Sequence, residues 1–205
     1  FEQMEMQFFV PPGTELKFYE EWKQKRLNWH LALGLGQENY KFHDHEKLAH
    51  YANAAADIEF KFPFGFKELE GIHSRTDFDL SAHEKFSGRK LQYFDPERNE
   101  NYVPYVVETS IGLDRMFLAL FSNCLKDEVL EDGSERTVLS LPPALAPVKA
   151  AILPLVKKDG LPEFAEKIFN DLKYDFNVIS EEKDSIGKRY RRQDAIGTPF
   201  CITVD

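Results

Sequence analysis

The tract Val107–Arg115 carries the strongest chemical signal in the sequence. It joins a strand that ends at Glu108 to a helix that Ser110 can cap, and Gly112 allows close approach to the backbone. Free N–H groups and the positive dipole end at such a helix start bind anions, and Arg115 adds a planar donor suited to phosphate. The alternative is structural: Ser110 only caps the helix, and the charged residues lie in solvent.

Acidic side chains crowd a second region. Strict alternation makes Phe66–Ile72 a strand on which Glu68 and Glu70 point the same way, and Glu5 lies on the polar face of an earlier strand. Together with Glu108, these carboxylates could bind an ammonium group or Mg²⁺. They could also be solvated surface charges.

Arg75 lies just beyond this strand. Its guanidinium could neutralise a substrate carboxylate or an α-phosphate. It could equally pair with Asp77 or Asp79 and serve the fold.

The histidines at the end of the first fifty residues suggest a metal site. His43, His45 and His50 could coordinate zinc, or they could be surface residues at a helix start that Asp44 caps. No nucleophile elbow, P-loop or GxGxxG motif is present, so these routes to catalysis or phosphate binding are unsupported.

A basic segment, Gly187–Gln193, places four cations around Tyr190. Cations that surround an aromatic ring suit a nucleic-acid backbone with one stacked base. A solvated helix face is the competing interpretation.

The elements that must position these residues follow from periodicity. Alternating or apolar runs predict strands, and helical spacing predicts helices, with Thr14 as the cap of the first helix. The strands are expected at residues 1–10, 57–63, 66–72, 148–156, 177–180 and 200–204, with a hairpin over 90–107. The helices are expected at residues 14–33, 46–56, 110–125, 162–176 and 185–196.

Charge divides the chain into two parts. The 205 residues hold 26 Lys and Arg against 35 Asp and Glu, a net charge of −9, yet residues 147–205 hold ten of each. The excess acid therefore lies in residues 1–146, and prolines at 142, 143 and 147 mark a candidate boundary. Strands that alternate with helices beyond it predict a mostly parallel sheet. The acidity excludes a uniformly basic nucleic-acid binder.

Taken together, these motifs resemble the class II glycyl-tRNA synthetases of the homodimeric type. The resemblance implies an α+β class II catalytic core, an antiparallel sheet with helices, over residues 1–140. It implies an α/β anticodon-binding domain with a mixed, mostly parallel sheet over residues 146–205. The segments that carry it are Phe1–Glu5, Glu68–Ile72 with Arg75–Asp77, Glu108–Arg115, and Lys188–Asp194 with Gly197–Phe200.

The resemblance also assigns roles to residues of this sequence. The positions expected to bind glycine are Gln3, Glu5, Glu70, Glu108 and Ser110. The positions expected to bind ATP are Phe1, which stacks on adenine, Glu68, which also binds Mg²⁺ through ATP, Leu69, Gly112 and Arg115. Arg75 and Arg115 are expected to be catalytic, near the α- and γ-phosphates respectively. The positions expected to bind tRNA are Lys188, Arg189, Arg191 and Arg192.

The implied activity is that of a glycine–tRNA ligase, which forms glycyl-adenylate from glycine and ATP and transfers glycine to tRNA(Gly). Mg²⁺ is expected with ATP, and no zinc. A homodimer of the full-length protein, a cytoplasmic location and no membrane partner are also expected. The chain lacks the family's motif 1, the ATP-binding arginine and acid of its motif 2, and the last strands of its anticodon-binding domain. The resemblance therefore implies a fragment that is inactive alone. The alternatives are a non-catalytic, synthetase-like RNA-binding paralogue and, more weakly, a histidine-dependent metalloprotein.

Overall fold

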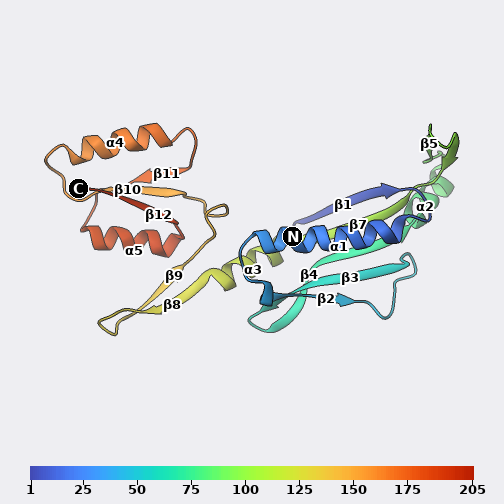
Figure 1. The fold of residues 1–205 in the computed structure, drawn as a ribbon, viewed down its shortest axis with the longest axis horizontal. Helices are drawn as coiled ribbons and strands as arrows, with labels where there is room; N and C mark the ends of the chain where they lie inside the picture. Colours follow the sequence, from blue (N-terminus) through green and yellow to red (C-terminus); the bar gives the residue numbers. More distant parts are fainter. The chain divides into compact units, whose positions relative to one another are not determined.

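The computed structural model describes residues 1–205, which form two compact units, Phe1–Ala119 and Leu120–Asp205 (Figure 1). The division falls within α3 (Leu113–Cys124). The predicted catalytic and anticodon-binding domains, residues 1–140 and 146–205, are functional assignments that this division does not test. None of the helices is both long and apolar enough to cross a membrane.

The first unit is built on a five-stranded sheet in which every neighbouring pair is antiparallel. Its strands, in spatial order, are β1 (Gln3–Val10), β7 (Tyr105–Gly112), β4 (Gly65–Thr76), β3 (Ala54–Phe62) and β2 (Tyr40–Asp44). The polar and apolar residues of β1 alternate, so this strand presents one apolar and one polar face.

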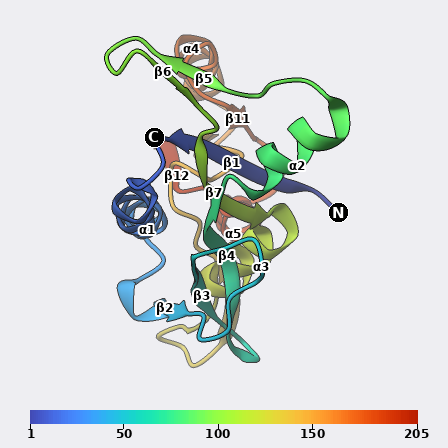
Figure 2. The same cartoon turned by 90° about the vertical axis from the view of Figure 1, so that its right-hand side faces the viewer.

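Helix α1 (Glu15–Ala32) covers the apolar face of this sheet (Figure 2). The ring of Phe8 on β1 lies 5.4 Å from the rings of both Phe18 and Trp22 on α1. Large apolar side chains of the sheet, such as Phe60 and Ile72, are fully buried on this side. The opposite face, called here the open face, carries the polar residues of β1 and β7.

A β-bulge in β4 corrects the prediction that Glu68 and Glu70 share a face. Ile58 pairs with Glu70 and Glu59 with Glu68, so Leu69 is an extra residue with no partner in the ladder. Neighbouring residues Ile58 and Glu59 face opposite sides of β3, and their partners must do the same. Glu68 therefore faces the open side and Glu70 faces α1.

Two further predictions for this unit are wrong. The helix expected at residues 46–56 is absent, because residues 45–53 form turns and Ala54–Ala56 belong to β3. Alanine favours helices, but the pairing of these alanines with Ser74, His73 and Ile72 prevails over that weak preference. Ser110 does not cap a helix, since β7 continues to Gly112.

The remaining elements of the first unit are short. The hairpin of β5 (Tyr93–Asp95) and β6 (Glu100–Tyr102) is shorter than the hairpin predicted over residues 90–107, since residues 105–107 belong to β7. A 3₁₀ turn covers Gln37–Asn39. Helix α2 (Phe78–Ser87) was not predicted from the sequence pattern. It follows β4 directly and brings Asp79 toward the site.

The second unit combines a hairpin with a three-stranded parallel sheet. The hairpin pairs β8 (Leu125–Val129) with β9 (Glu135–Leu139) around a turn at Asp132–Gly133. The sheet has the order β11-β10-β12, and Figure 1 shows α4 and α5 on its two sides. The bounds are β10 (Ala150–Pro154), α4 (Leu161–Leu172), β11 (Val178–Ser180), α5 (Ile186–Ile196) and β12 (Phe200–Val204).

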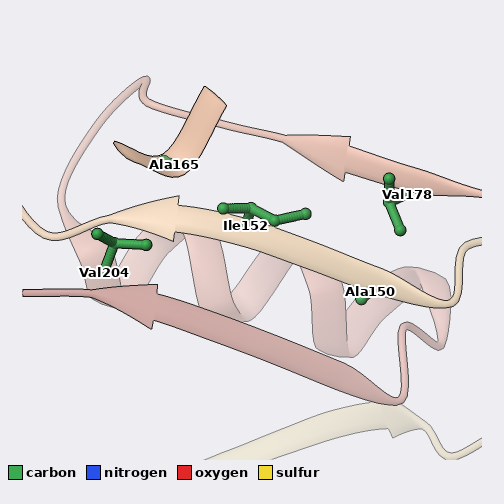
Figure 3. Close-up of a cluster of buried hydrophobic side chains, with 5 residues drawn as sticks. All are labelled: Ala150, Ile152, Ala165, Val178 and Val204. Atoms are coloured by element: carbon green, nitrogen blue, oxygen red, sulfur yellow. The ribbon is translucent and has the colours of Figure 1, made fainter. Parts of the chain in front are cut away.

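The core of the second unit lies between this sheet and α4. Figure 3 shows Ile152 on β10 between Val178 and Val204 of the neighbouring strands, with Ala165 of α4 nearby. The parallel sheet and the order of strands and helices predicted for residues 148–204 are confirmed, because buried parallel strands read as short apolar runs.

Candidate active site

The open face of the first unit's sheet holds a pocket of about 340 Å³. Three strands meet at its floor, because Gln3 on β1 pairs with Gly112 on β7, and β4 lies beside β7. Its lining combines acidic, basic and aromatic groups. The lining residues are Phe1, Glu2, Gln3, Glu68, Leu69, Ser110, Gly112, Asp114 and Arg115.

Strand register places the polar residues in rows across the sheet. One row joins Glu5, Ser110 and Gly71 on three neighbouring strands. The next row joins Gln7, Glu108 and His73. Residues in register lie about 5 Å apart. The structure therefore brings the predicted Glu5 together with Glu108 and Ser110 from two distant parts of the sequence.

The hydroxyl of Ser110 is held at the junction of the pocket and these rows. Gln3 Nε2 donates to Ser110 Oγ at 2.5 Å and to Glu5 Oε1 at 3.1 Å. The amide of Gln3 thus orients both oxygens on the open face. An ammonium group bound here could replace that amide as the donor.

Glu108 and Arg75 form an ion pair beside this row. Arg75 donates from Nη1 to Glu108 Oε1 at 3.1 Å and from Nε to Asp79 Oδ2 at 2.8 Å, and Gln7 Nε2 donates to Glu108 Oε2 at 2.5 Å. Burial alone would lower the pKa of Arg75, but the hydrogen bonds and charges of the two carboxylates raise it overall. The alternative partner predicted for Arg75, Asp79, is confirmed as a structural contact. Arg75 also lies over the ring of Tyr51.

At the other end of the pocket, Arg115 meets Glu68. Arg115 Nη1 donates to the backbone oxygen of Glu68 at 2.5 Å and lies 3.4 Å from its carboxylate Oε2. Both side chains are about half exposed. Phe1 stands fully exposed at the rim. A cation, a carboxylate and an aromatic ring therefore surround one opening.

Glu70 is absent from this group, which corrects its predicted contact with glycine. Its carboxylate is fully buried against α1, where Arg26 and His30 bind it. Burial raises the pKa of Glu70, but hydrogen bonds from His30 and Arg26 outweigh it and lower the pKa overall. The physical reason is the bulge at Leu69, which a strict two-residue alternation does not predict.

The sequence interpretation missed His73 and Gln7 as neighbours of the site. The ideal Cβ position at Gly71 lies 2.8 Å from His73 Cε1, so the imidazole occupies the space above that glycine. Burial lowers the pKa of His73, and the nearby charges of Glu108 and Asp57 only partly oppose it. The continued alternation of β1 could have found Gln7.

The predicted histidine cluster does not converge. His43 lies 3.4 Å from Glu59, His45 lies 2.9 Å from Asp57, and His50 packs against Phe78 instead. The structure contains no group of three or more His, Cys, Asp or Glu side chains arranged to hold a metal ion.

The four basic residues of α5 lie in three different environments. Arg189 is buried and donates to the backbone oxygens of Pro154, Leu155 and Glu181, so its predicted contact with tRNA is corrected to a structural one. Lys188 and Arg191 are exposed.

Arg192, the last of the four, is paired within the unit. It contacts Glu181 at 2.5 Å and Asp184 at 3.0 Å, and these carboxylates neutralise its charge locally. The helical repeat explains why Arg189 is buried while its neighbours are exposed, because Arg189 and Gln193 lie four residues apart on the buried face of α5. The basic segment therefore offers fewer free cations than its composition suggests.

The chain is similar to known proteins over its whole length. Residues 149–205 match a family described as an anticodon binding domain. Over its whole length the chain is 56% identical to a glycine–tRNA ligase of Chlorobaculum tepidum, covering 44% of that protein. It is likewise 53% identical to one of Borrelia hermsii and 54% identical to one of Geobacillus thermodenitrificans, covering 47% and 44% of them. The chain thus spans less than half the length of these relatives, and the predicted resemblance to glycyl-tRNA synthetases is confirmed across it.

A solved structure supports the fold. Prolyl-tRNA synthetase of Giardia lamblia, in complex with prolyl-adenylate, matches 98% of this chain and 40% of its own length, with a TM-score of 0.60 and 16% identity. At this identity the match shows a shared fold alone. The antiparallel sheet followed by a parallel sheet is therefore an arrangement seen in a synthetase.

Proposed function

We propose that the chain supplies part of the active site and the anticodon-binding region of a glycine–tRNA ligase. Identity above 50% over the whole chain to several glycine–tRNA ligases carries this proposal. The open face adds the chemistry, with carboxylates for an ammonium group at one end and an arginine for phosphate at the other. The full protein is proposed to act as a cytoplasmic homodimer on glycine, ATP and tRNA(Gly).

The row of Glu5 and Ser110 is the proposed glycine site. Glycine has no side chain that a pocket could bind. Charge-assisted hydrogen bonds from its ammonium group to Glu5, Glu108 and Ser110 must therefore orient the substrate. A hydrophobic pocket discriminates a single methylene by only about 1–3 kcal/mol. His73, above Gly71, narrows the space beside this row and favours the smallest amino acid.

The opening lined by Phe1, Glu68 and Arg115 is the proposed ATP site. The ring of Phe1 would stack on adenine, the backbone at Leu69 and Gly112 would line the nucleotide, and Arg115 would bind the γ-phosphate. The exposed carboxylate of Glu68 fits Mg²⁺ bound through ATP, because this ion prefers a few carboxylate oxygens together with phosphates. When bound, Mg²⁺ neutralises phosphate charge.

Arg75 lies beside Glu108, at the end of the glycine site that is farther from Arg115. We propose that it guides the glycine carboxylate toward the α-phosphorus, while Glu108 and Asp79 hold its guanidinium in place. The carboxylate attacks the α-phosphorus, the bond to the bridging oxygen breaks, and pyrophosphate leaves. Such chemistry depends on positioning and charge neutralisation and needs no protein nucleophile.

The second unit is proposed to contact tRNA. Lys188 and Arg191, which are exposed on α5, would bind the phosphate backbone, in line with the anticodon-binding family match. Arg189 supports α5 from within.

The proposal can be tested with a chimera in which this chain replaces the matching segment of the Chlorobaculum tepidum enzyme. We expect glycine-dependent exchange of pyrophosphate into ATP within about tenfold of the parent enzyme's rate, because a 56% identical segment should preserve the site geometry. The control carries Glu108→Ala and should lose exchange. A folded chimera that binds tRNA without catalysing exchange would favour the non-catalytic paralogue.

A further inference from the structure

A buried ion cluster lies directly behind the proposed ATP site. Arg26 of α1 donates from Nε to Glu70 Oε1 at 2.5 Å and from Nη2 to Oε2 at 3.1 Å. His30, one turn further along α1, lies 2.7 Å from Glu70 Oε2 through Nε2. Both His30 and Glu70 are completely buried. We call Arg26, His30 and Glu70 the clamp.

The clamp is more elaborate than helix packing requires. Burying a carboxylate is unfavourable unless a partner with good geometry compensates, and an apolar residue at the same place often serves stability as well or better. Here the guanidinium binds both oxygens and stacks on Trp29, with its carbon Cζ 4.6 Å from the ring centre. Such a costly arrangement fixes one geometry of the backbone around Glu70.

That backbone contains the bulge that shapes the pocket. Leu69, next to Glu70, is the unpaired residue of β4, and Glu68 on its other side faces the open side. The backbone oxygen of Glu68 accepts the hydrogen bond from Arg115, and Leu69 itself lines the pocket. Three consecutive residues therefore connect the buried clamp to the proposed phosphate-binding arginine.

We propose that Glu70, Arg26 and His30 are positioning residues, which act through the bulge at Leu69 to hold Glu68 and Arg115 in the geometry that binds ATP. This inference rests on the proposed function. The clamp touches no substrate. Losing it lets β4 relax toward regular pairing, which rotates Glu68 away from Arg115 and loosens the ATP end of the site. Glu5, Glu108 and Ser110 of the glycine end lie on β1 and β7 and stay in place.

The first experiment separates the two ends kinetically in the chimera. Glu70→Gln keeps the size of the side chain and removes its charge. We expect the KM for ATP to rise about tenfold and the KM for glycine to change less than about twofold, since small displacements of positioned groups have large kinetic effects. Arg26→Lys, which keeps the charge but loses the two-pronged contact, should give a smaller rise of the same kind.

The matched control removes another ion pair between α1 and the sheet. Lys23 of α1 binds Asp44 at the end of β2, with 2.8 Å between Nζ and Oδ1, away from the bulge. Lys23→Met should lower the melting temperature and leave both KM values unchanged. Equal effects of Lys23→Met and Glu70→Gln on the KM for ATP would show that the clamp is merely structural and would overturn the inference.

The second experiment needs no activity. Hydrogen exchange of the 205-residue chain reports directly on the bulge. We expect peptides that cover residues 66–72 to exchange about tenfold faster in Glu70→Gln, because the backbone at the bulge then opens without unfolding of the rest of the unit. The same peptides should not exchange faster in Lys23→Met. Unchanged protection there would contradict the inference. If Glu70→Gln fails to fold, Arg26→Lys is read in the same way. If the unmodified chimera lacks exchange activity, the proposed function fails, and the protection of residues 66–72 still decides the role of the clamp.

Discussion

One arginine of each unit is bound in a contrasting way. In the first unit, Arg75 on the open face is bound by carboxylates from other elements, Glu108 and Asp79. In the second unit, the buried Arg189 donates only to backbone oxygens. A side-chain carboxylate beside a pocket can exchange partners when a charged substrate arrives, whereas a backbone oxygen within a fold cannot. The comparison teaches that, of these two arginines, Arg75 can change partners when a charged substrate binds, whereas Arg189 supports the fold.

The largest effect is expected at the pocket. Arg115→Ala in the chimera should lower kcat/KM for ATP about 10³-fold, roughly 4 kcal/mol, because a donor aimed at developing phosphate charge is lost. The measurement is ATP–pyrophosphate exchange at varied ATP.

Arg98 is the matched control for this variant. It is as exposed as Arg115, 51% against 52%, but lies on the β5–β6 hairpin near Asp95 and Glu100. Arg98→Ala should leave kcat/KM unchanged. Equal losses from both variants would refute a specific role for Arg115.

The next effect should appear in stability. Arg189→Ala leaves three backbone oxygens without their charged donor, and we expect it to destabilise the second unit by about 3 kcal/mol. Arg191→Ala, on the exposed side of the same helix, should change stability by less than about 0.5 kcal/mol. Urea denaturation of the 205-residue chain measures both. Similar urea midpoints for the two variants would mean that the hydrogen bonds of Arg189 do not stabilise the second unit.

A smaller effect is expected on tRNA binding. Lys188→Ala combined with Arg191→Ala should weaken binding of tRNA(Gly) about tenfold and reduce the slope of log K against log salt by about 2, one for each lost phosphate contact. Fluorescence anisotropy over a series of KCl concentrations gives the slope. The exposed α4 residue Lys167, changed to Ala together with Lys173, is the control and should leave the slope unaltered.

The smallest effect concerns pH. Because the folded chain lowers the pKa of His73, the unfolded chain binds its proton more readily. The stability that follows from this pKa difference is fully present above the ordinary histidine pKa of about 6.5. It is lost as the pH falls toward the pKa of His73 in the folded chain, by at most about 1.4 kcal/mol per pH unit. His73→Gln should reduce the stability difference of the first unit between pH 7 and pH 5.5. The exposed His83, changed to Gln, should not reduce it.

The two units also differ in how far the sequence predicts them. In residues 148–204 every predicted strand and helix is present, because short apolar strands and amphipathic helices alternate in the regular order of a parallel sheet. The first unit departs from such rules. Ala54–Ala56 lie in a strand because long-range pairing decides their conformation, and α2 was missed.

The candidate site shows the same limit. Glu5, Ser110, Glu108 and Arg115 could be predicted, because motifs place them at the ends or on the polar faces of elements. Glu70 could not be placed, because one unpaired residue reverses the face of every side chain beyond it. Arg189 was assigned to tRNA because it lies in a basic segment. The composition of such a segment does not reveal which of its cations is buried and supports the fold.

The most direct test of the central claim, that the open face forms glycyl-adenylate, is a crystal structure of the chimera with a non-hydrolysable glycyl-adenylate analogue. We expect the ammonium group within hydrogen-bonding distance of Ser110 and Glu108, the adenine beside Phe1, and Glu70 still bound to Arg26 without contacting the ligand. An analogue bound elsewhere, or a Glu70 carboxylate turned onto the ammonium group, would contradict the account.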